Sequence, residues 1–123
     1  MKRAVVVWVL AGGVASGLAF GQQGGQGSGQ GGGEAGLGQL ARGKAVFEKW
    51  CAPCHGAGPG KPGTAALQAL YKGQKPALLE QRTDLKPEIT KTFVRNGVTV
   101  MPFFRKTEIS DAELDALAAY LAQ

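Results

Sequence analysis

The run from Cys51 to His55, CAPCH, contains both cysteines and the only histidine of the chain. Three kinds of site use such a cluster: a zinc site, a thiol/disulfide exchange site, and a haem bonded through two thioethers. Each of them requires a different fold around the cluster. The choice among the three therefore constrains the whole chain more than any other feature does.

Zinc is disfavoured by the supply of ligands. A structural zinc site uses four Cys or His side chains, and this chain has two cysteines and one histidine. Adjacent Cys54 and His55 would also be strained as ligands of one ion.

A dithiol exchange site is the second alternative, because C-x-x-C with Pro53 between the sulfurs resembles thioredoxin-like oxidoreductases. In those proteins the motif begins a helix that follows a β-strand. Here Leu40, Phe47 and Trp50 recur at helical spacing, which predicts an amphipathic helix over residues 39–50. A helix before Cys51 disfavours this alternative.

C-x-x-C-H fits the third site best. Thiols at i and i+3 on one helical turn can each add to a vinyl group of haem, and the next residue is directed at the iron. The pattern predicts one covalently attached haem c, with Cys51 and Cys54 as the cofactor-binding residues and His55 as an iron ligand. It also explains how two cysteines avoid forming a disulfide in an oxidising compartment.

Residues 1–21 have the form of a secretory signal peptide: Lys2-Arg3, an apolar stretch over 4–20, and small residues around a cleavage site before Gln22. A second possible site follows Ala15. The apolar stretch is shorter than the roughly 20 residues that span a bilayer. We therefore expect a periplasmic protein, with membrane attachment only if the segment is retained as an anchor.

Glycine dominates the next segment, which predicts a flexible Gly/Gln-rich leader over 22–37 and one folded domain over 38–123. The formal net charge of the chain is +5, and its basic residues are scattered among acidic ones. Nucleic-acid surfaces usually show a basic stripe, so we expect no nucleic-acid partner.

Helix signals continue to the C-terminus. Short helical segments are expected at 64–71 and 76–81, Pro87 and Gly97 delimit a helix of about ten residues, and a capping box at Ser110 and Glu113 begins the last helix. No alternating apolar run is long enough to found a sheet. The fold class predicted is all-α.

Met101 is the candidate for the second iron ligand. It is the only methionine left after signal removal, and Pro102 stiffens the loop that would present it. The alternative is that Met101 fills a gap in the core. His/Met ligation raises the reduction potential and closes the iron to small molecules. It therefore predicts an electron carrier that is not itself an enzyme, whereas an unbound Met101 would leave an open-site haem enzyme.

These residues together resemble the class I monohaem cytochromes c. The resemblance covers 38–123 and lies in four patterns: Gly43-x-x-x-Phe47, Cys51-x-x-Cys54-His55, Met101-Pro102 and Leu117-x-x-Tyr120. It implies three to five helices wrapped around a covalently attached haem.

The same resemblance implies specific contacts. The first and last helices would cross closely at Gly43, and Phe47 would pack near Tyr120. A proline carbonyl, from Pro62 or alternatively Pro59, would accept a hydrogen bond from the imidazole of His55.

More narrowly, residues 82–123 resemble the small cytochrome subunits of p-cresol methylhydroxylase-type flavoprotein dehydrogenases. This resemblance implies that the protein accepts single electrons from a redox partner, a flavin-dependent alkylphenol dehydrogenase subunit. The alternative is a stand-alone soluble cytochrome c of a respiratory chain. In either case an apolar patch around the haem edge, with a basic rim, would contact the partner. Candidate rim residues are Lys61, Lys72, Lys75, Arg105 and Lys106.

Overall fold

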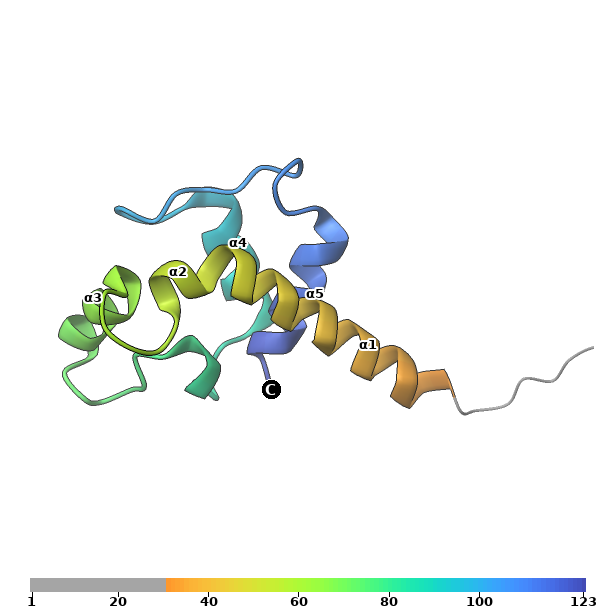
Figure 1. Ribbon diagram of the computed structural model, residues 1–123, viewed down its shortest axis with the longest axis horizontal. Helices are drawn as coiled ribbons and strands as arrows, with labels where there is room; N and C mark the ends of the chain where they lie inside the picture. The colour runs from red at the N-terminus through yellow and green to blue at the C-terminus, as the bar shows by residue number, and fades with distance from the viewer. Residues whose placement is uncertain (1–30) are drawn as a thin grey trace, which may run out of the picture.

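The computed structural model describes residues 31–123 (Figure 1). Along the chain the elements are α1 (Gly31–Val46), a π-helical segment η1 (Phe47–Cys51), α2 (Ala52–His55), α3 (Pro62–Tyr71), a 3-10 turn η2 (Leu79–Gln81), α4 (Pro87–Asn96) and α5 (Asp111–Leu121). The only β-pairing within 31–123 is an isolated bridge between Val98 and Met101. The fold is all-α, as predicted. The predicted signal peptide, its cleavage site and the first part of the leader, up to residue 30, lie outside the described residues.

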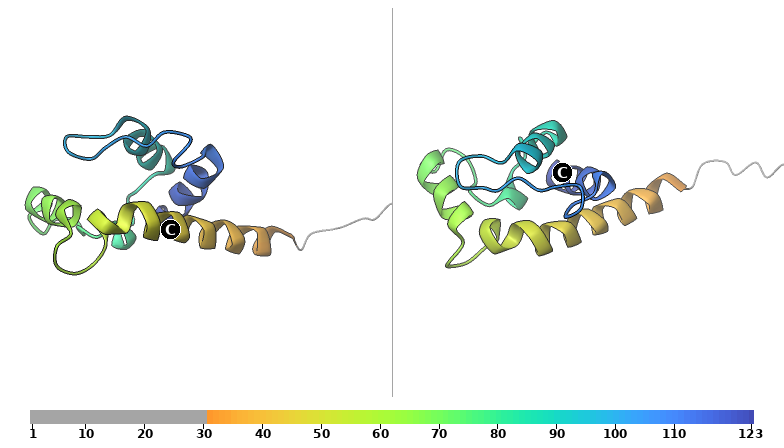
Figure 2. Two further views of the ribbon diagram at one scale, coloured as in Figure 1. Left: turned by 45° about the horizontal axis from the view of Figure 1, so that its top comes forward. Right: turned by 90° about the horizontal axis from the view of Figure 1, so that it is seen from above.

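The first helix is longer than the sequence predicted. α1, η1 and α2 follow one another without a break, and the rod begins at Gly31, inside the segment expected to be flexible. Its first turns project past α5 in all views (Figures 1 and 2). They are not held by packing, since Leu37 is 69% exposed and a Cβ on Gly36 would meet nothing. Once a helix is nucleated, each further residue adds one hydrogen bond, although each glycine in this stretch costs about 0.5–1 kcal/mol relative to alanine.

α1 and α5 cross closely at Gly43. A Cβ atom on this residue would lie 2.6 Å from the Cβ of Tyr120 and closer still to the carbonyl oxygen of Ala116. One turn further on, the ring centroids of Phe47 and Tyr120 are 6.0 Å apart. Both contacts implied by the cytochrome c resemblance are confirmed. The buried hydrophobic cluster around the crossing consists of Val46, Phe47, Val94, Ile109, Leu114, Leu117 and Leu121.

The start of α5 has the predicted capping box. Ser110 Oγ accepts a hydrogen bond from the backbone N–H of Glu113, and the Glu113 carboxylate accepts one from the backbone N–H of Ser110 at 2.8 Å. Ile109 and Leu114, on either side of the cap, are buried. These local bonds fix where α5 begins, and therefore where it meets α1.

The middle of the chain follows the prediction in part. α3 begins at Pro62, two residues earlier than expected, and α4 covers Pro87–Asn96 with Gly97 at its C-cap with φ 69°. At 76–81, where a short helical segment was expected, the structure has the turn η2 preceded by bends at residues 77 and 78.

Candidate functional site

The two thiols lie on one helical turn. Cys51 is the last residue of η1, and Cys54 follows three residues later in α2. Both are free cysteines; Cys51 is half-buried and Cys54 exposed. The structure therefore keeps the i, i+3 arrangement that two thioether bonds to one planar group require.

The winding of the rod changes just before this turn. In η1 the backbone N–H of Ala52 donates to the carbonyl of Phe47, five residues earlier, so the segment is π-helical. Such wide turns inside α-helices occur frequently at functional sites. Nothing in the sequence pattern predicted η1.

His55 ends α2 with its ring against the start of α3. A Cβ atom on Gly63 would lie 2.6 Å from the imidazole Cε1 and 2.8 Å from Nδ1, so only glycine fits there. Beside it, Thr64 Oγ1 donates to the carbonyl of Gly56 at 2.9 Å and closes the loop between α2 and α3. Sequence reasoning missed the roles of both residues, because it gave Gly63 none and placed Thr64 only at the start of a short helical segment.

Nδ1 of His55 is buried and has no hydrogen-bond partner among the described residues. Pro62 is the first residue of α3 and adjoins Gly63, but its carbonyl does not accept the predicted bond here. Pro62 and the alternative Pro59 therefore stay predictions. Burial lowers the pKa of His55 below its usual value. The neutral imidazole is favoured, which is the form that binds metal.

Met101 lies in a tight turn between α4 and α5. Its N–H donates to the carbonyl of Val98 at 2.8 Å, and the Val98 N–H donates back to the Met101 carbonyl at 3.1 Å. Thr99, inside the turn, has φ 49°, an unusual value for a β-branched residue. The Met101 side chain is half-buried and packs against the hydrophobic cluster. The pair of backbone bonds thus fixes the part of the loop that presents the thioether.

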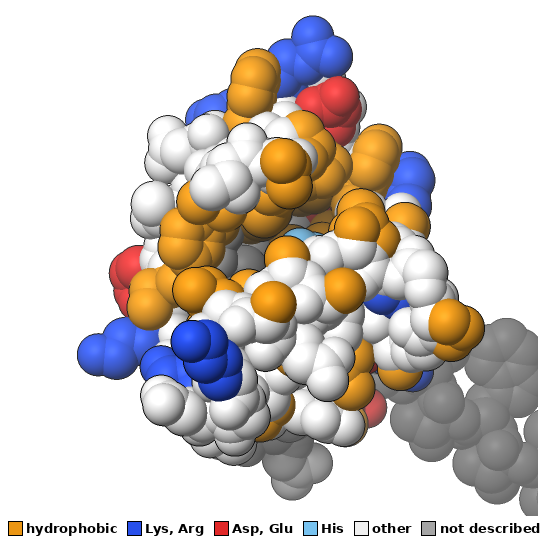
Figure 3. Space-filling model, turned by 90° about the vertical axis from the view of Figure 1, so that its left-hand side faces the viewer, with side chains coloured by type: hydrophobic (Ala, Val, Ile, Leu, Met, Phe, Trp, Pro, Cys, Tyr) orange, Lys and Arg blue, Asp and Glu red, His pale blue; other side chains and the backbone are white. Residues whose placement is uncertain are grey.

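A hollow opens at the end of the molecule formed by α3 and the loop after α4. Figure 3 shows it with the histidine at its base and hydrophobic side chains around its mouth. Large apolar side chains at this end of the molecule are exposed to solvent, and Val100 is 95% exposed. The others are Leu70, Phe93, Val98 and Phe103. Exposed apolar clusters of this kind mark surfaces that bind an apolar group or partner.

The donor set and the hollow fit a covalently attached haem. Two thiols on one turn, a neutral imidazole with a buried unbonded nitrogen and an apolar hollow are what that cofactor needs. Among residues 31–123, no three His, Cys, Asp or Glu side chains gather in a way that could hold a metal ion.

The thiols are unlike those of a dithiol oxidoreductase. Burial, together with the neighbouring Cys54, raises the pKa of Cys51 to about 12. Reactive cysteines of exchange enzymes instead have a lowered pKa, since the thiolate is the nucleophile. The segment before Cys51 is helical and not a strand. Both observations disfavour the thiol exchange alternative.

Three of the five predicted rim cations are paired with acids. Lys75 lies 3.0 Å from Asp84, Arg105 lies 3.3 Å from Glu108, and Lys106 lies 2.7 Å from Asp111. Lys61 and Lys72 flank α3 and take part in no ion pair within the described part of the chain. The basic rim stays a prediction, with Lys61 and Lys72 as its two cations outside these ion pairs.

Comparison with known proteins gave one match. The model of a protein family described as cytochrome c oxidase, cbb3-type, subunit III matches residues 38–121, which is most of the chain. Searches of curated proteins and of solved structures returned no match. None of the helices within residues 31–123 combines the length and apolar character needed to cross a membrane.

Proposed function

Because the chain belongs to the cytochrome c family, we propose that it is a one-electron carrier whose haem is ligated by His55 and Met101. Membership implies a covalently bound haem c with iron, and that group supplies the one-electron exchange when bound. The residues of this chain attach it, ligate its iron and shield it from water. The observation that carries the proposal is the C-x-x-C-H turn, whose histidine lies at the base of an apolar hollow.

The roles of the attaching residues follow from their places. Cys51 and Cys54 would each form one thioether, and His55 would bind the iron through Nε2. Gly63 supports this assignment, since it leaves room for the imidazole against α3. The Pro62 carbonyl would accept a hydrogen bond from Nδ1–H once iron holds the ring.

Met101 supplies the second iron ligand in this proposal. Its support is the turn that Val98 and Met101 close, at the end of the molecule where the hollow opens. With His55 and Met101 both as ligands, the cofactor would exchange electrons and would not bind peroxide or gases.

An absorption spectrum of the purified exported protein tests the ligand set. His/Met ligation predicts a low-spin ferric spectrum with a weak far-red sulfur-to-iron band, and Met101→Ala should abolish that band while the haem stays attached. A high-spin spectrum in the parent protein would instead favour the open-site haem enzyme. A colourless protein with two titratable thiols would refute haem attachment itself.

Residues 82–123 and their resemblance to p-cresol methylhydroxylase-type subunits support a flavoprotein dehydrogenase as electron donor. The description of the matching family, a respiratory oxidase subunit, favours the second candidate, a respiratory-chain carrier. Stopped-flow mixing separates the two. The first predicts rapid reduction by a p-cresol methylhydroxylase flavoprotein subunit that its substrate has reduced. The second predicts no such reduction and rapid oxidation by vesicles that contain a cbb3-type oxidase.

The contact surface proposed for the partner is the rim of the hollow. Val100 and Phe103 expose 95% and 60% of their surface there, and Lys61 and Lys72 remain free to attract an acidic partner. Transfer needs only close approach, so a small transient interface suffices. The bimolecular rate should fall as ionic strength rises.

We also propose a periplasmic location, after removal of residues 1–21. The domain proposed is 38–123, preceded by a leader over 22–37 of which residues 31–37 are helical in the structure. N-terminal sequencing of the mature protein tests this, with Gln22 as the expected first residue.

A further inference from the structure

The segment that carries Met101 has few attachments to the rest of the molecule. We call residues 97–105 the Met101 loop; the two backbone bonds between Val98 and Met101 close its tip but join it to nothing else. Val100 and Phe103 point largely into solvent. The first backbone bond from the loop to a helix beyond its tip is donated by Phe104 N–H to the Val94 carbonyl, at 2.8 Å. Gly97 N–H bonds to the Phe93 carbonyl at the start of the loop, and the half-buried Met101 side chain packs against the hydrophobic cluster. At the far end, the position of the loop depends on how Phe104 is held.

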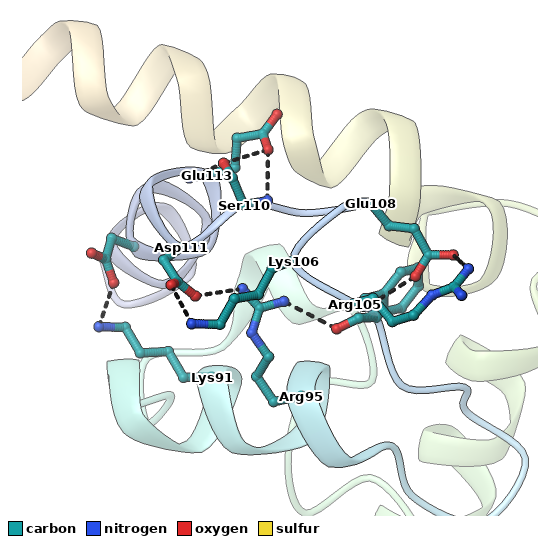
Figure 4. A network of polar contacts seen from close by, with 10 residues as sticks. Lys91, Arg95, Arg105, Lys106, Glu108, Ser110, Asp111 and Glu113 are labelled. Carbon is teal, nitrogen blue, oxygen red and sulfur yellow. Dashed lines mark hydrogen bonds and ion pairs between the residues drawn. The ribbon is translucent and has the colours of Figure 1, made fainter.

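Arg95 holds the other polar backbone group of Phe104. Its Nη1 donates to the Phe104 carbonyl at 3.0 Å, and its Nη2 donates to Asp111 Oδ1 at 3.0 Å (Figure 4). The Arg95 side chain is 22% exposed, and its bond to the Phe104 carbonyl is partly shielded from water, whereas its bond to Asp111 is exposed. One guanidinium thus ties the end of α4, the Met101 loop and the first residue of α5 together.

Phe104 also joins the loop to the helix that carries the cysteines. Its ring packs edge-on against Trp50, with centroids 5.8 Å apart, and Trp50 directly precedes Cys51. A displacement of Phe104 would therefore change the position of the loop relative to the thiol turn.

We propose that Arg95 is a positioning residue that sets how firmly Met101 can hold the iron, acting through Phe104. Phe104 lies three residues after Met101, a reach of roughly 10 Å at full extension, and Pro102 stiffens the chain between them. Without Arg95 the Phe104 carbonyl loses its charged donor and the loop gains freedom to swing away. The inference rests on the proposed ligation by Met101.

The chain offers a matched control. Lys91 and Asp115 form another ion pair between α4 and α5, at 2.6 Å, which contacts no residue of the Met101 loop (Figure 4). Arg95→Met and Lys91→Met each remove one cation that joins these helices and keep an aliphatic stem. Only the first releases Phe104.

The test is the affinity of the ferric haem protein for added imidazole, which competes with Met101. Arg95→Met should tighten imidazole binding roughly tenfold and weaken the far-red band, because the loop detaches more easily. Lys91→Met should change the affinity by less than about twofold, since exposed ion pairs contribute little. Equal effects of the two variants, with the band present in the parent, would overturn the inference alone. A parent without the band would overturn the ligation by Met101 together with the inference.

A second pair of variants, Arg95→Lys and Lys91→Arg, provides the test if Arg95→Met does not fold. Arg95→Lys keeps the charge but cannot hold Phe104 and Asp111 in the same planar fork. It should therefore also tighten imidazole binding, whereas Lys91→Arg should not. An unchanged affinity in Arg95→Lys would contradict the role of Arg95.

Discussion

Gly63 lies directly against the face of the His55 imidazole, so that a Cβ atom there would be 2.6 Å from Cε1. Gly63→Ala must therefore push the ring or α3 away. We expect a loss of about 1–3 kcal/mol in the free energy of unfolding, typical of overpacking. Because the ring is the proposed iron ligand, the absorption spectrum and reduction potential should change too. Thermal melts and redox titration check this, and an unaltered potential would show that the ring is held independently of Gly63.

Two glycines of α1 should respond in opposite ways to alanine. At Gly43 the added methyl would collide with the α5 backbone at Ala116, so we expect Gly43→Ala to destabilise the protein by several kcal/mol or to prevent folding. At Gly38 a Cβ meets nothing, so Gly38→Ala should raise helix stability by roughly 0.5–1 kcal/mol. Chemical denaturation of both variants measures the contrast. Similar destabilisation by both would mean that the crossing is looser than described.

Asp84 should make the free energy of unfolding depend on pH in the acid range. Hydrogen bonds from Arg82, and then from Lys75, hold the pKa of Asp84 well below its usual range. A carboxyl whose pKa is lower in the folded state stabilises the protein at pH values above its unfolded pKa of about 4. This stabilisation is lost as the pH falls through the folded-state pKa. Asp84→Asn should therefore lower the melting temperature by a few degrees at neutral pH, with a smaller difference at acid pH.

The structural reason is the burial of Arg82, which is only 8% exposed and donates to both carboxylate oxygens of Asp84. The substitution leaves one neutral acceptor oxygen in their place, beside the Tyr71 hydroxyl at 2.8 Å. Asp115→Asn is the control, because Asp115 pairs with Lys91 at the surface. A melting-temperature difference for Asp84→Asn that does not vary with pH would contradict the assignment.

Thr99 stores backbone strain in the turn that precedes Met101. Its φ of 49° is unfavourable for a β-branched residue, whereas Asn adopts it readily. Thr99→Asn should stabilise the protein by about 1 kcal/mol. Denaturant titration measures the gain, and a loss of stability would indicate that the Thr99 side chain makes a favourable contact in solution.

Loss of the cofactor should unfold most of the domain. The buried cluster is small and centred on the α1–α5 crossing, while Leu70 and Phe93 at the hollow are 70% and 45% exposed. We therefore expect a Cys51→Ala, Cys54→Ala double variant, made without haem attachment, to lose most of its helical circular dichroism. Native-like helicity in that variant would show that the helices pack without the cofactor.

Features encoded by neighbouring residues were predictable from the sequence. The capping box at Ser110 and the Pro87 start of α4 are local signals, and the structure has both. The crossing at Gly43 came from the family resemblance, which carries information on distant contacts that spacing alone lacks.

Features that depend on distant contacts were missed. Gly63 touches His55 across a loop, Arg82 bonds Tyr71 from 11 residues away, and Arg95 reaches Asp111 from 16 residues away. No periodic pattern records such pairs, because each is fixed only after the helices have packed. The early start of α1 was missed for the opposite reason: glycine composition argued against a helix that simply continues from its packed part.

The π-helical segment η1 has a consequence for insertions and deletions. Each residue of an α-helix turns the chain by about 100°, so the wide turn sets the azimuth of everything that follows it. Because the wide turn holds one residue more than an α-turn, deleting Lys49 would restore ordinary winding and leave His55 near its present azimuth relative to Gly43. An inserted residue would instead rotate His55 by about 100° about the helix axis, away from its groove against α3. The length of this short segment therefore sets the rotation about the helix axis between the residues that pack against α5 and the C-x-x-C-H turn.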